Sequence, residues 1–181
     1  MIIVPIVINE VATKGSTGTC NDEDWVELWN PGNLLVNLED FILHDDKGSN
    51  DKDAYKFGPT HSIGPSEYLL LCGKSSFKFG IGSSDTVSLT NNIGHLVATT
   101  GQLSGEDSIK DITYARMDGG GYVRTEIPTP GAENQFRGNI ISYYNSPNSY
   151  VYNFLVLITI YRHCLNDERY FYSRSNHHDC A

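Results

Sequence analysis

Short alternating segments separated by turn residues fill the first three quarters of this 181-residue chain, and they constrain its fold more than any other feature. In one such segment, Val26 and Leu28 alternate with Trp25, Glu27 and Trp29. A period of two places alternate side chains on opposite faces of a β-strand. Because residues 1–134 contain no run of ten or more residues with a helical period, the sequence predicts an all-β domain there.

Turn signals recur about every ten residues, which is typical of a sandwich or a barrel. The alternation slips at Glu39 and Asp40, and this slip predicts a bulge or a tight turn. Pro128, Pro130 and Gly131 end the pattern. The predicted strands are 6–9, 25–29, 36–39, 41–43, 68–71, 86–89, 96–98, 112–114 and 122–125.

The composition changes after Asn134, so we expect two parts. Residues 1–134 form the predicted β-domain, and residues 135–181 form an irregular C-terminal extension. The one strongly apolar piece of the extension, 151–161, is too short to cross a bilayer as a helix. The extension is interpreted as a poorly packed tail or as mispredicted coding sequence, with a docked extra strand or helix as the alternative.

The charge of the chain bears on its partners. The formal net charge is −9, and the first 134 residues hold 9 basic and 19 acidic residues. Such a domain repels a phosphate backbone, which argues against nucleic acid as a direct partner. We therefore expect a protein partner, of unknown identity, and no membrane span.

Acidic residues crowd the loop that follows the segment 41–43, and they are the candidate metal ligands. The candidate calcium ligands are Asp45, Asp46, Asp51 and Asp53. Flexible loops rich in carboxylates suit calcium. The spacing is not that of an EF-hand, because Lys56 or Phe57 stands where the bidentate glutamate belongs. The alternative is a solvated loop that keeps the domain soluble.

Two of the four cysteines, Cys20 and Cys72, are the candidates for a disulfide bond. One precedes a predicted strand and the other ends one, so they could face each other across the domain. A bridge would imply an oxidising compartment. The alternative is two separate thiols.

Evidence for catalysis is thin. Glu10 and Glu27 stand on predicted strands, where a buried pair could have a raised pKa suited to acid or base chemistry. Acids on strands are more often exposed at an edge or bonded to backbone. No nucleophile elbow or phosphate-binding loop accompanies them, so we expect no enzyme.

The order of the segments resembles the lamin tail domain family. The segments that carry the resemblance are 8–11 (INEV), 24–32 (DWVELWNPG), 36–38 (VNL), 41–43 (FIL), 63–71 (IGPSEYLLL), 79–82 (FGIG), 85–89 (DTVSL), 114–116 (YAR) and 128–134 (PTPGAEN). This resemblance implies an immunoglobulin-like β-sandwich and a non-catalytic structural or protein-binding module without a cofactor.

The resemblance leaves the setting of the domain open. Members of the family occur in nuclear lamins and in microbial surface or secreted proteins. This chain has no heptad rod and no basic cluster, and its acidity and its two candidate cysteines favour the microbial, extracellular type. An acidic, calcium-binding surface domain accessory to a secreted hydrolase is the alternative, and a nuclear scaffold component is the third.

Trp25 and Trp29 are the candidate partner-binding residues. They point the same way on one predicted strand, and tryptophan is a frequent anchor at protein interfaces. The competing interpretation places both in the core, beneath the second sheet or the loops.

Overall fold

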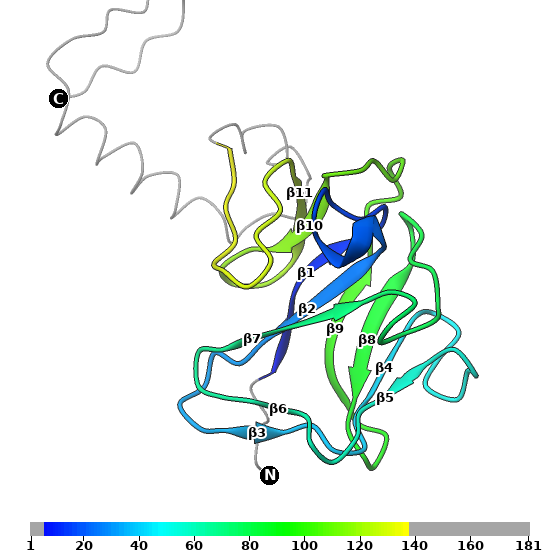
Figure 1. Ribbon diagram of the computed structural model, residues 1–181, viewed down its shortest axis with the longest axis vertical. Coiled ribbons are helices and arrows are strands. Elements are labelled where there is room, and N and C mark those ends of the chain that lie inside the picture. Colours follow the sequence, from blue (N-terminus) through cyan, green and yellow to red (C-terminus); the bar gives the residue numbers. More distant parts are fainter. Residues whose placement is uncertain (1–5, 138–181) are drawn as a thin grey trace, which may run out of the picture. The chain divides into compact units, whose positions relative to one another are not determined.

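The computed structural model of the chain describes residues 6–137 (Figure 1). Within this range the chain is all-β, apart from one 3-10 turn at Cys20–Asp22. No helix of these residues is long and apolar enough to cross a membrane. Residues 138–181, including 151–161, lie outside the described residues, so the predicted boundary at Asn134 stays a prediction.

The larger of two main sheets has five antiparallel strands in the order β11-β10-β1-β2-β7 (Figure 1). Its strands are β1 (Val7–Ala12), β2 (Trp25–Trp29), β7 (Tyr68–Cys72), β10 (Thr113–Arg116) and β11 (Tyr122–Thr125). All five correspond to predicted strands.

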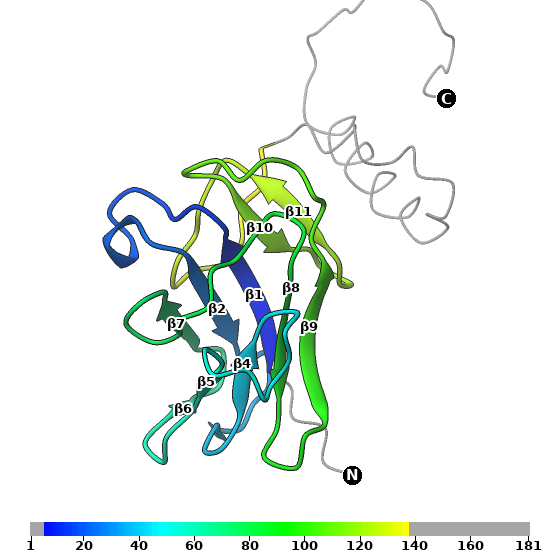
Figure 2. The same ribbon diagram turned by 90° about the vertical axis from the view of Figure 1, so that its right-hand side faces the viewer.

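The second main sheet has four antiparallel strands in the order β5-β4-β8-β9, and it lies across the core from the first (Figure 2). Its strands are β4 (Ile42–His44), β5 (Tyr55–Lys56), β8 (Thr86–Thr90) and β9 (Leu96–Gln102). A short pair, β3 (Val36–Asn37) with β6 (Ser62–Ile63), completes the described strands. The two-residue strands β5 and β6 are too short to show a period, so the sequence did not predict them.

The core forms between the inner faces of the two main sheets. Val26 and Leu28 of β2 are fully buried there with Leu43 and Leu89 of the opposite sheet. This is the inward row that the alternation predicted, and burying such side chains is the main driving force for folding. The fold is therefore a β-sandwich, one of the two all-β architectures that the turn spacing predicted, and it agrees with the immunoglobulin-like sandwich that the family resemblance implied.

A bulge in β1 changes which residues face the core. Ile8 pairs with Leu28, but Glu10 pairs with Glu27, so the register shifts by one residue at Asn9. Without this shift Glu10 would share the face of Ile8 and enter the apolar core. The bulge instead sends Glu10 to the opposite face of the sheet.

The predicted break at Glu39 and Asp40 is a tight turn. The Phe41 amide donates to the Leu38 carbonyl oxygen at 2.9 Å, and Asp40 has a φ of 63°. Aspartate tolerates this left-handed conformation better than most residues. The turn restores the inward orientation for Phe41 and Leu43, which are both buried.

Candidate functional site

The outer face of the five-stranded sheet, the side away from the core, carries both candidate tryptophans and both candidate glutamates. On β2 this face presents Trp25, Glu27 and Trp29, because Val26 and Leu28 between them face inward. On the neighbouring strand the antiparallel register places Tyr68 opposite Trp29 and Cys72 opposite Trp25. Both tryptophans therefore point the same way, as predicted.

Trp25 is a structural residue on this face. Its side chain is fully buried, and its Nε1 donates to the Ser16 hydroxyl at 2.7 Å. A buried indole N–H needs such a partner. Trp25 is thus covered by the loop between β1 and β2 and lies outside the core between the sheets. This agrees with the competing interpretation, in which loops bury the tryptophan.

Trp29 is the more accessible of the two tryptophans. It is only partly buried, and its ring stacks on Tyr68 with centroids 6.0 Å apart and an interplanar angle of 14°. The two residues are cross-strand partners, so the sheet itself holds the rings together. Tyr68 was not among the predicted site residues, because only the strand register reveals that it lies beside Trp29.

The segment 128–134, named here the closing segment, crosses the same outer face and ends the described domain. Thr129 donates to Glu10 Oε2 twice, from its backbone N–H at 3.0 Å and from its hydroxyl at 2.8 Å. Gly131 donates its backbone N–H to Glu27 Oε2. Asn134 donates its side-chain amide to the carbonyl oxygens of Asn9 and Arg116.

The two glutamates complete their hydrogen bonding within the sheet. Thr113 donates its hydroxyl to Glu10 Oε1, and Asn9 donates its side-chain amide to Glu27 Oε1 at 2.8 Å. Every carboxylate oxygen of the pair thus accepts at least one hydrogen bond. Both side chains are fully buried.

Burial is the largest influence on the pKa of both Glu10 and Glu27. Desolvation raises the pKa of Glu27 to about 7, with a further contribution from the charge of Glu10, and the hydrogen bonds from Gly131 and Asn9 oppose it. Desolvation likewise raises the pKa of Glu10 above its usual range, against the hydrogen bonds from Thr113 and Thr129. The pair is buried with raised pKa values, as acid or base chemistry would require, but each of its oxygens already holds a structural partner.

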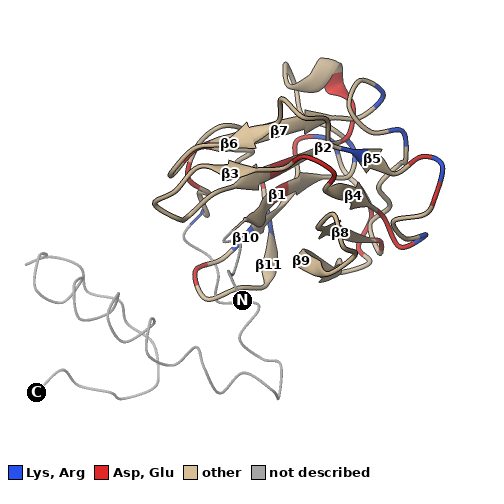
Figure 3. Cartoon of the chain, turned by 90° about the horizontal axis from the view of Figure 1, so that it is seen from below, with Lys and Arg blue, Asp and Glu red and all other residues tan. Residues whose placement is uncertain are grey.

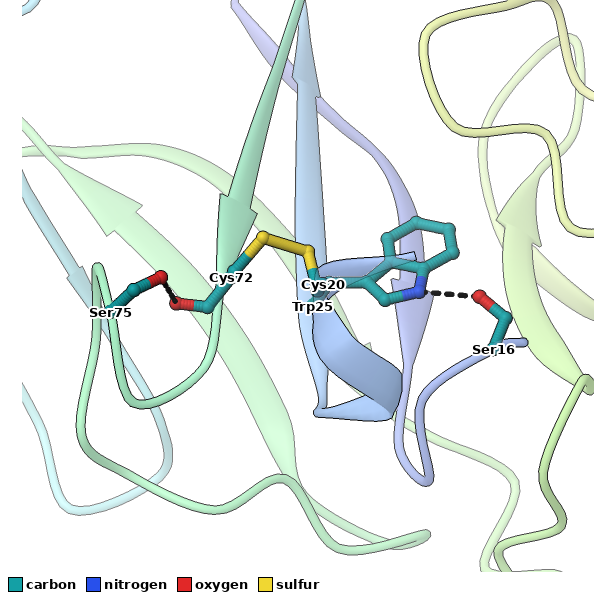
Figure 4. The surroundings of a disulfide bond; sticks show 5 residues. All are labelled: Ser16, Cys20, Trp25, Cys72 and Ser75. Atoms are coloured by element: carbon teal, nitrogen blue, oxygen red, sulfur yellow. Dashed lines mark hydrogen bonds between the residues drawn. A yellow bond between two sulfur atoms is a disulfide. The ribbon is translucent and has the colours of Figure 1, made fainter. Parts of the chain in front are cut away.

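Cys20 and Cys72 form a disulfide bond in the structure (Figure 4). The bond ties the loop before β2 to the end of β7, with Cα atoms 5.2 Å apart, beside the buried Trp25. Cys20 and the next two residues all have φ between 53° and 65°. Three successive left-handed residues are unfavourable for L-amino acids, so the bond and the surrounding contacts must hold this turn in place.

The four candidate calcium ligands do not converge. Lys47 occupies both carboxylate oxygens of Asp45, donating its backbone N–H to Oδ1 at 3.0 Å and its Nζ to Oδ2 at 2.9 Å. Asp51 Oδ1 accepts the backbone N–H of Asp53, whose own carboxylate pairs with Lys52 at 2.7 Å. Asp46 is exposed. Among residues 6–137, no group of three or more histidine, cysteine, aspartate or glutamate side chains is placed to hold a metal ion.

The fold and this outer face define an immunoglobulin-like β-sandwich domain. The family model of the Lamin Tail Domain matches residues 3–104, more than half of the chain, and the chain therefore belongs to that family. The match ends before β10. The resembling segments 114–116 and 128–134 lie beyond the match, but the structure joins both to β1: 114–116 lies in β10, which pairs with β1, and Thr129 of 128–134 donates to Glu10. No curated protein matches the chain.

Proposed function

We propose that this domain is a non-catalytic protein-binding module that engages a partner through the outer face of its five-stranded sheet. The observation that carries the proposal is the Trp29–Tyr68 stack, the partly exposed aromatic pair of that face. Stacked aromatic side chains offer a large contact area at a low cost in conformational entropy, and they recur as anchors of protein interfaces.

The use of the ionisable groups supports a non-catalytic role. Glu10 and Glu27, the buried pair with raised pKa values, accept hydrogen bonds from Thr113, Thr129, Asn9 and Gly131. A general acid or base must reach a substrate proton. These carboxylates instead fasten the closing segment, which supports a structural interpretation of the pair.

The negative net charge of the domain and its disulfide bond support a location outside the cell or at the cell surface. The formal net charge of −9 favours a partner with a basic contact surface over nucleic acid. The Cys20–Cys72 bond supports an oxidising compartment. A nuclear scaffold role is the third candidate, and co-purification with histones or envelope proteins would favour it.

The proposal is tested by comparing the full chain with two variants as bait for extracellular proteins of the source organism. We expect a partner that the unaltered chain retains and that Trp29→Ala loses by at least about tenfold, as removal of an interface anchor predicts. Leu34→Ser is the matched control, because Leu34 is exposed but lies in the loop between β2 and β3. Equal retention by a folded Trp29→Ala variant would contradict the proposal.

A further inference from the structure

The edges of the two main sheets are not equally protected against pairing with another chain. Exposed edge backbone invites an extra strand, and natural proteins block it with short strands, bulges or charges. In the second sheet, β5 has two residues including Lys56, and β9 carries two register shifts against β8. In the first sheet, β11 carries Arg124.

The fourth edge, β7, has none of these protections. Its five residues, YLLLC, contain no charge and pair with β2 without a register shift. Tyr68 and Leu70 are partly buried on the outer face, and Leu69 is partly buried against the core. Figure 2 shows β7 at the margin of its sheet.

The hydrogen-bond pattern shows which backbone groups of β7 point away from β2. Asn30 donates its N–H to the Glu67 carbonyl oxygen, and Gly73 donates its N–H to the Asp24 carbonyl oxygen. In an antiparallel ladder the bonded pairs alternate, so residues 69 and 71 also bond to β2 while 68, 70 and 72 turn outward. The carbonyl oxygen of Cys72 already accepts the N–H of Ser76 at 2.8 Å, so the open part of the edge is Tyr68 and Leu70. No hydrogen bond within the described residues uses the outward N–H or carbonyl of Tyr68 or Leu70.

The charges beside this edge indicate the charge of the partner that it would bind. Glu67 and Glu133 are exposed. Desolvation raises the pKa of the Tyr68 hydroxyl, and the charges of Glu27 and Glu133 raise it further. Lys74, the nearest basic residue along the chain, is already paired with Glu23. Residues 1–134 hold 19 acidic and 9 basic residues, and Figure 3 shows acidic residues on several loops of the described domain. A second copy would bring the same net negative charge, so a basic partner fits better.

We infer that β7 is a docking edge at which an extended, basic segment of a partner protein adds to the five-stranded sheet as a sixth strand. This inference rests on the proposed protein-binding function and names the mode of binding. Main-chain hydrogen bonds to Tyr68 and Leu70 supply affinity, and alternate side chains of the added strand supply specificity. A lysine or arginine on the outer face would lie near the Trp29–Tyr68 stack and the acidic residues around it.

Synthetic peptides test the inference without altering the protein. The probe is a labelled peptide of about eight residues in which lysine alternates with valine, titrated into the full, oxidised chain. Two derivatives carry backbone N-methyl groups on one or the other alternating set of residues. Only one set of amides can face β7, so we expect one derivative to bind as the parent does and the other at least about tenfold more weakly. An acidic peptide of alternating glutamate and valine is the charge control.

A pair of variants tests the same edge from the protein side. Leu70→Pro removes an N–H that points away from β2, so the ladder keeps all its bonds. Leu70→Ala removes the same side chain but keeps the N–H. We expect the proline variant alone to weaken binding about tenfold, with both variants folded by circular dichroism.

Three outcomes overturn the inference. If both methylated peptides bind equally but Trp29→Ala weakens them, the partner lies on the face and not at the edge, and the proposed function stands. If the basic peptide binds no better than the acidic one, the predicted occupant is wrong, and the bait experiment with Trp29→Ala still decides the proposed function. If sedimentation shows a dimer that Leu70→Pro dissociates and that excludes the peptide, a second copy occupies the edge.

Discussion

Glu10 and Glu27 lie opposite each other on neighbouring strands, both fully buried, and both accept hydrogen bonds from the segment that closes the domain. No basic side chain donates to either carboxylate within the described residues. The pair therefore depends on backbone N–H, hydroxyl and amide donors, and it links the stability of the sheet to the placement of the closing segment.

The first prediction concerns pH. The pKa of Glu27 is raised from 4.5 to about 7, so its contribution to stability is fully present below about pH 4.5 and is lost as the pH rises through 7. At 1.36 kcal/mol per pKa unit, the free energy of unfolding should fall by about 3 kcal/mol over this range from Glu27 alone. The raised pKa of Glu10 acts in the same direction. Urea denaturation at a series of pH values measures the slope.

The matched variant for the pH prediction is Glu27→Gln. It removes the titrating group, so the loss of stability between pH 4.5 and 8 should shrink markedly even if the variant is less stable throughout. A variant with the same slope as the unaltered chain would show that the pH dependence arises elsewhere.

The second prediction concerns the end of the domain. A chain truncated after residue 137 keeps the closing segment and should fold like residues 6–137 of the full chain. Truncation after residue 127 removes the donors from Thr129 and Gly131 and leaves two buried carboxylates short of partners. Each unsatisfied group costs about 1–3 kcal/mol or more when charged, so the shorter chain should have a much lower melting temperature. Equal thermal stability of the two truncated chains would contradict the role given to the closing segment.

The sequence predicted the parts of this fold that depend on local periodicity. Val26 and Leu28 lie on one face of β2 and Trp25 and Trp29 on the other, because a period of two is a property of one strand alone, but the sequence left open whether the tryptophan face is in the core. The slip at Asp40 was also visible locally, since it interrupts the alternation at a turn-forming residue.

The sequence could not predict features that depend on distant contacts or on a change of register. The orientation of Glu10 follows from the bulge at Asn9, and no residue type in the sequence indicates a bulge at this position. Thr129 lies 119 residues from its partner Glu10, so only the folded chain pairs them. The motif 128–134 was recognisable as part of a family pattern, but its role on the outer face was not. The choice between a Cys20–Cys72 bond and two thiols was also left open by spacing alone.

The third prediction concerns the disulfide bond. Cys20 and Cys72 are 52 residues apart, and closing a loop of this length restricts the unfolded chain by about 4 kcal/mol in the chain-entropy model. The double variant Cys20→Ser with Cys72→Ser should lose stability of that order. A reductant should lower the melting temperature of the unaltered chain but not that of the double variant. A reductant effect of equal size in both would point away from this bond.

The fourth prediction concerns Trp25 and Ser16. Ser16→Ala leaves the buried indole N–H without an acceptor and should cost about 1–3 kcal/mol of unfolding free energy. Trp25→Phe removes the donor and part of the buried ring. Combining the two changes should cost less than the sum of the single changes, because neither polar group is then left unpaired. Strict additivity would show that the hydrogen bond contributes nothing to stability.

The fifth prediction concerns calcium and separates the binding module from its calcium-dependent alternative. Lys47 occupies both oxygens of Asp45, and Lys52 pairs with Asp53, so a calcium ion would have to displace two ammonium groups before it gathered its ligands. We therefore expect calorimetric titration of the full chain with calcium to millimolar concentration to show no saturable heat. The double variant Asp45→Asn with Asp51→Asn is the control and should give the same flat trace. Binding in the unaltered chain that this variant abolishes would favour an acidic, calcium-dependent surface domain instead.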